Sequence, residues 1–142
     1  MNKEDIVIPT IFLGVVILTS FVPVVQIILM TLCGGLTHIV TIPFDSNERV
    51  ENIIGIIFNS ILTLIGLFLF YKTKTTLTRI LTSFFVLFFG HGIMLFTVDQ
   101  ILKGDESYYI NWTVLSGTPV LLTLLVGLLK YWTLNSKQMT ET

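Results

Sequence analysis

The chain has 142 residues, of which 53% are hydrophobic and 12% charged, and its mean hydropathy is +0.86. A soluble domain is typically about 25% charged, and a soluble fold of this size could not bury so much apolar side chain. The net charge of -1 leaves no basic surplus for nucleic acid, and the single cysteine, Cys33, excludes an internal disulfide. The composition therefore predicts a protein whose solvent is lipid.

Long uncharged stretches divide the chain, and each reaches the length of a bilayer crossing. They lie between Asp5 and Asp45, Glu51 and Lys72, Arg79 and Asp99, and Glu106 and Lys130, with 39, 20, 19 and 23 residues. A spanning helix needs about 20 apolar residues, and strand-like alternation is missing. We therefore predict an all-α membrane protein, a four-transmembrane-helix bundle in one domain (1–142). Its expected helices are about 6–32, 52–71, 79–101 and 109–132, before a polar tail, 133–142.

The first expected helix contains two prolines. Pro9 falls in its first turn, where proline is tolerated, whereas Pro23 falls in its middle and predicts a kink. Residues 33–44 stay apolar but are interrupted by Gly34 and Gly35, so we expect them to lie on or dip into the outer leaflet. The start "MNKEDIV" has more acid than base, which argues against a cleaved signal peptide.

Positive charge predicts the orientation. With four spans, both termini share a face with the loop after the second helix, and that face has six basic residues against two on the other: Lys3, Lys72, Lys74, Arg79, Lys130 and Lys137 against Arg49 and Lys103. Basic residues stay on the cytoplasmic side, so we expect both termini there. Richness in Ile, Thr, Phe, Asn and Lys suggests an AT-rich bacterial genome, and hence a bacterial inner (cytoplasmic) membrane.

Small and weakly polar residues recur on one face of three helices. The set is Gly55, Asn59, Thr63 and Gly66; Ser83, Gly90 and Thr97; and Thr113, Ser116, Thr123 and Gly127, beside Gly117 and Pro119. Two interpretations stay open: close helix packing, or a polar channel along the bundle axis. Packing is favoured because no stripe contains a charge, which polar pore linings usually have.

The candidate ion or proton path consists of His91, Asp99, Asn59 and Gln26. His91, between Gly90 and Gly92, lies twelve residues beyond Arg79, which places it about 18 Å into the bilayer. A titratable group at that depth is a functional candidate. In the alternative interpretation, His91 is a neutral hydrogen-bonding partner between helices, and Asp99 lies in water and pairs with Lys103.

No enzyme, metal-site or nucleotide motif occurs in the sequence, so no enzyme activity, metal or cofactor is expected. The leading hypothesis is a small non-enzymatic membrane protein that acts through helix contacts, as a subunit of a membrane complex or as a homo-oligomer. Its expected partners are the lipid bilayer and other membrane subunits, and not nucleic acid. The alternatives are a small ion, proton or solute transporter or channel, and a membrane-acting toxin, defence effector or immunity protein.

Overall fold

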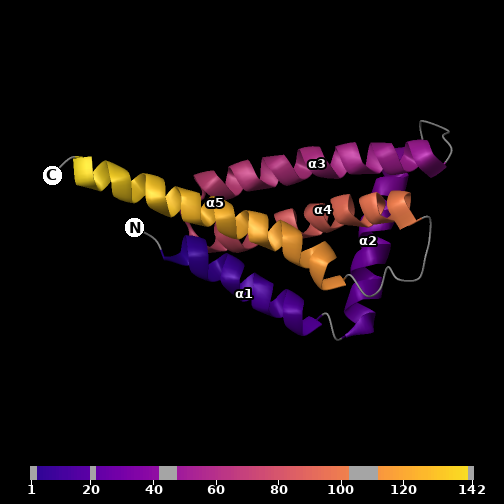
Figure 1. Cartoon of the computed structure of the whole chain (residues 1–142), viewed down its shortest axis with the longest axis horizontal. Helices are drawn as coiled ribbons and strands as arrows, with labels where there is room; N and C mark the ends of the chain where they lie inside the picture. The colour runs from indigo at the N-terminus through magenta and orange to yellow at the C-terminus, as the bar shows by residue number, and fades with distance from the viewer. Residues whose placement is uncertain (1–2, 20–21, 42–47, 103–111, 141–142) are drawn as a thin grey trace.

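The computed structural model describes residues 3–19, 22–41, 48–102 and 112–140. Within these ranges the chain is helical apart from short turns, which confirms the predicted all-helical class. The helices, shown in Figure 1, are α1 (Glu4–Thr19), α2 (Pro23–Thr41), α3 (Glu48–Lys72), α4 (Thr76–Leu102) and α5 (Trp112–Thr140).

A tight turn joins α3 and α4 into an antiparallel hairpin, which is the most extensive helix pair of the structure. Thr73 closes the end of α3, because its hydroxyl donates to the carbonyl of Phe70 at 2.7 Å. Thr75 precedes α4 and accepts a hydrogen bond from the backbone N–H of Thr78 at 3.3 Å. A threonine oxygen that satisfies an early helix N–H is an N-cap, so the local sequence determines where α4 begins.

The hairpin packs with α5 and α1 into a group of four helices. α1 lies against α5 and more lightly against α4, while α2 contacts α3 and α4. Figure 1 shows both chain termini at the same end of this group, together with the turn between α3 and α4. The start of α1 and the end of α5 therefore lie at the same end of the bundle.

The stretch 6–32, expected as one kinked helix, is divided between α1 and α2. Pro23 is the first residue of α2, and Figure 1 shows α2 turning steeply away from α1. Proline has no N–H to donate and is well placed at a helix start. This explains a new helix at Pro23 in place of a kink. Residues 33–41 continue α2 as regular helix, and residues 42–44 of the expected outer-leaflet segment lie outside the described ranges.

Three of the described helices are long and apolar enough to cross a membrane. The spans are Arg49–Lys72 in α3, Thr76–Met94 in α4 and Gly117–Lys137 in α5. α1 has 16 residues and is therefore about 24 Å long. That length is a little less than the hydrocarbon thickness of about 30 Å.

Candidate functional site

The interior of the molecule is more polar than its surface. Ten polar or charged side chains are buried in the described ranges, against seven apolar ones when Pro9 and Pro119 are included. The polar ones are Asp5, Asn52, Asn59, Thr63, Thr73, Arg79, Ser83, His91, Thr123 and Lys130. Large apolar side chains instead cover the outside of every described helix. A soluble protein has the opposite distribution, so the fold has the properties of an α-helical integral membrane protein.

A buried cluster of charges joins three helices at the end where the termini lie. The Asp5 carboxylate of α1 accepts hydrogen bonds from Arg79 Nε of α4 at 2.6 Å and from Lys130 Nζ of α5 at 2.9 Å. The side chain of Asp5 is only 2% exposed, and those of Arg79 and Lys130 are 3% and 11% exposed. Three charges buried so deeply must be mutually compensated, because an isolated one would be very costly.

Further contacts complete the cluster. Arg79 Nη1 donates to the Glu4 carboxylate at 3.0 Å and to the carbonyl of Lys74 at 3.1 Å. Lys130 Nζ donates to the carbonyl of Thr73 at 2.8 Å. Arg79 and Lys130 therefore bind both carboxylates of α1 and the two backbone carbonyls that directly follow α3. The cluster fastens α1, the α3–α4 turn and α5 at one level.

The sequence prediction missed this cluster, since it used Asp5, Arg79 and Lys130 as boundaries of apolar stretches, and the two bases as indicators of orientation, without pairing them. A signal was available: the predicted topology brings all three to one membrane face, and Arg79 and Lys130 are directly preceded and followed by apolar or uncharged residues. Opposite charges placed at one depth on neighbouring helices are candidates for a buried ion pair.

Glycines of the predicted packing stripes lie at close helix contacts. A Cβ atom added to Gly127 would collide with the backbone carbonyl of Asp5, and one added to Gly90 would collide with the ring of Pro119. At Gly66 it would fall 2.7 Å from the Val86 side chain. Three further predicted packing positions are buried, Gly55, Thr63 and Gly117, but a Cβ added to Gly117 would meet no neighbour within 4 Å. Small residues at such contacts let backbones approach closely in lipid.

Asn59 of α3 lies in the interior and faces α4. Its side-chain Nδ2 donates to the carbonyl of Gly55, one turn earlier, at 2.7 Å. The same amide lies so close to Gly92 of α4 that a Cβ there would collide with Asn59 Oδ1. The amide thus occupies the space that the missing side chain of Gly92 leaves. Asn59 is therefore placed at the α3–α4 contact, adjacent to the backbone of His91.

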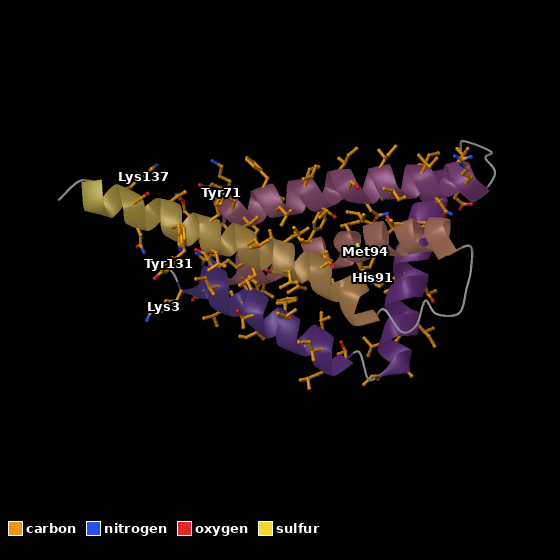
Figure 2. All side chains as sticks on the ribbon, viewed as in Figure 1. Lys3, Tyr71, His91, Met94, Tyr131 and Lys137 are labelled. Atoms are coloured by element: carbon orange, nitrogen blue, oxygen red, sulfur yellow. The ribbon has the colours of Figure 1, made fainter. Side chains whose placement is uncertain are left out.

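His91 is 1% exposed, and it lies toward α1 and α2, whereas Gly92 lies against Asn59 of α3. Its imidazole lines a cavity of about 380 Å³ between α1, α2 and α4, and Asn59 does not belong to the lining. Figure 2 shows His91 well away from the end that Lys3, Tyr71, Tyr131 and Lys137 occupy. The structure therefore brings His91 to the first two helices, on the other side of α4 from the α3 contact.

The remaining members of the predicted path, Gln26 and Asp99, belong to α2 and α4. Their side chains lie outside the described part of the structure, as do those of Cys33 and His38. Within the described part, no three His, Cys, Asp or Glu side chains form a group that could hold a metal ion.

Comparison with known proteins adds no family to this description. No family model, no curated protein and no solved structure matches the chain. The functional argument therefore rests on the molecule's own geometry.

Proposed function

We propose that this chain is a non-enzymatic integral membrane protein that acts through contacts between its helices and other membrane helices. It serves as a subunit of a membrane complex or assembles with copies of itself. Both termini face the cytoplasm of a bacterial cell. The six-to-two distribution of basic residues supports this orientation, and the meeting of Asp5, the α3–α4 turn and Lys130 at one end of the helices supports a common side for both termini.

The observation on which the proposal rests is the outward face of α3. It forms a continuous row of exposed apolar side chains at helical spacing: Ile53, Ile57, Ile61, Leu64 and Phe68. The opposite face of α3 packs on α4 and α5 and contains the small and polar residues. One face of α3 is packed within its own bundle, and the other face has a regular row of apolar side chains. Such a row can pack against a further helix in the membrane.

Site-specific photocrosslinking in the native membrane tests the proposal. A benzoylphenylalanine placed at Ile57, Ile61 or Leu64 should give one defined protein adduct, which mass spectrometry then assigns to this chain or to another subunit. The matched control is the same probe at Leu121 or Leu125, on the exposed face of α5. Adducts with lipid alone at every α3 position, together with a monomeric mass in mild detergent, would contradict the proposal.

A second candidate function is transport of protons or small polar solutes, which the polar face of α3 favours. Asn52, Asn59 and Thr63 are all buried along this one face, and Thr73, directly after the helix, is buried as well. Among the described residues, the hydroxyls of Thr63 and of Ser83 on α4 are buried without a hydrogen-bond partner. Buried hydroxyls normally have partners, so these two oxygens retain capacity for water or a permeating solute.

Proteoliposomes test this second candidate. Purified protein should discharge an imposed pH gradient, read with an entrapped pH-sensitive dye, and Asn59→Leu or Thr63→Val should abolish the flux. The control is Thr10→Val, since Thr10 is exposed on α1 and its hydroxyl bonds only within its own helix. Flux in Asn59→Leu and Thr63→Val equal to that of the parent would exclude a path along this face of α3.

A further inference from the structure

The cavity between α1, α2 and α4 is distinct from the charge cluster and from the α3 row. Its volume is about 380 Å³, within the range of about 300–1,000 Å³ that is typical of small-molecule sites. Most of its walls are aliphatic or aromatic: Phe12, Val15, Val16, Val25, Ile28, Leu32, Phe84, Leu87 and Phe88. An apolar cavity of this kind excludes water and accepts apolar ligands.

Two polar side chains belong to the described lining, Thr19 and His91. The Thr19 hydroxyl lies 2.9 Å from the carbonyl of Val15 and 3.2 Å from that of Val16, so its hydrogen bond is made within α1. The imidazole of His91 is the other polar group of the described lining, and its two ring nitrogens are groups of the kind that hydrogen-bond to an oxygen. A pocket with apolar walls and one well-placed polar group is the usual construction of a small-molecule site.

The depth of His91 restricts the ligand's chemistry. Twelve residues of α4 separate it from Arg79 in the charge cluster, a rise of about 18 Å, and the hydrocarbon core is about 30 Å thick. A charged head group would be costly at that depth, which excludes a phospholipid head beside the imidazole. An uncharged molecule with one carbonyl or hydroxyl oxygen satisfies both the apolar walls and the ring nitrogen.

We propose that this cavity is a binding site for an uncharged lipophile whose chain lies among the aromatic and aliphatic walls and whose single oxygen hydrogen-bonds to His91. The ligand enters from the membrane, because the outer sides of the lining helices are themselves apolar. Phe84 and Ile28 are each 53% exposed on these helices and also belong to the cavity wall. This site is independent of the helix-contact function proposed above.

A matched pair of probes tests the site in the full-length protein in lipid nanodiscs. Radiolabelled 1-decanol and decane have the same chain and differ by one oxygen. Each should show saturable binding in excess of protein-free nanodiscs, with one molecule bound per protein. Val16→Phe and Leu87→Phe, which fill the cavity from α1 and α4, should each remove the excess for both probes. Leu64→Phe, on the exposed face of α3, should leave both unchanged.

The proposed hydrogen bond to the imidazole is tested by comparing the binding of 1-decanol with that of decane. His91→Phe should weaken 1-decanol binding by about two- to twelvefold, the factor expected for one net hydrogen bond, and leave decane unchanged. His91→Gln, which keeps a hydrogen-bonding side chain, should recover part of that loss. In ¹⁵N-histidine-labelled protein, 1-decanol but not decane should shift the His91 ring resonances, which His91→Phe distinguishes from those of His38.

Four results would overturn the proposal. The first is no saturable excess of either probe in the parent, and the second is full binding in both cavity-filling variants while they keep their helical circular dichroism. The third is an equal loss of 1-decanol and decane in His91→Phe. The fourth is ring resonances that respond to both probes alike. A loss confined to 1-decanol, restored by glutamine, would support the assignment of His91 to the ligand's oxygen.

Discussion

Replacing Asp5 with Asn would remove the negative charge that Arg79 and Lys130 share, while keeping the size of the side chain. Arg79 and Lys130 both donate to Asp5 Oδ1, at 2.6 and 2.9 Å, and all three side chains are almost fully buried. Removing one partner of a buried ion pair costs about 3–5 kcal/mol, because the remaining charge stays buried. Arg79 keeps Glu4 as a partner, so we expect a loss near the lower limit, about 3 kcal/mol.

The measurement is the free energy of unfolding in mixed dodecylmaltoside and SDS micelles, followed by loss of helical circular dichroism. Glu4→Gln is the matched control: Glu4 is 40% exposed, and an exposed ion pair is worth about 0.2–1 kcal/mol. A third variant, Asp5→Leu with Lys130→Met, removes opposite charges together and should recover most of the stability lost in Asp5→Asn, since apolar replacement of a buried pair is often neutral. If Asp5→Asn costs no more than Glu4→Gln, the cluster does not hold the helices together.

Three further predictions concern packing and the membrane. Gly127→Ala should lower the free energy of unfolding by about 1–3 kcal/mol, because the new methyl group meets the backbone carbonyl of Asp5. The control is Gly14→Ala, which has open space around it and should be neutral or slightly stabilising. Equal effects of the two variants in the same unfolding assay would refute the Gly127–Asp5 contact. Gly92→Ala should destabilise the parent but have a much smaller effect in an Asn59→Ala background, and a double-mutant cycle without coupling would show that the two side chains do not meet. The chain should sediment with membranes on ultracentrifugation and stay there through a carbonate wash, and a protein that remains in buffer without detergent would contradict the membrane assignment.

The helical class and the three membrane-length helices follow from local properties of the sequence. Uncharged stretches such as 52–71 have the length of a bilayer crossing, and in hydrocarbon only helices or closed barrels satisfy all backbone hydrogen bonds. The structure has α3 over Glu48–Lys72, slightly longer at both ends. Helix ends depend on single capping interactions, such as the Thr75 oxygen before α4, which periodicity does not reveal.

The division between α1 and α2 could not be derived in the same way. Pro23 is compatible with a kink and with a new helix start, and the choice depends on where the second segment packs. In the structure α2 turns away from α1 and contacts α3 and α4, and the cavity beside His91 lies between α1, α2 and α4 as a result. A site enclosed by three helices depends on their relative positions, so hydropathy along the chain contains no signal for it.

The sequence by itself determined that lipid is the solvent, that the backbone is helical and that small residues line one face of several helices. These features depend on composition and on residues a few positions apart. Only the tertiary structure decided that Asp5 meets residues 74 and 125 positions away, and that adjacent residues His91 and Gly92 face different neighbours. The physical reason is that successive helix residues point about 100° apart, so a small rotation of one helix changes which neighbour each side chain meets.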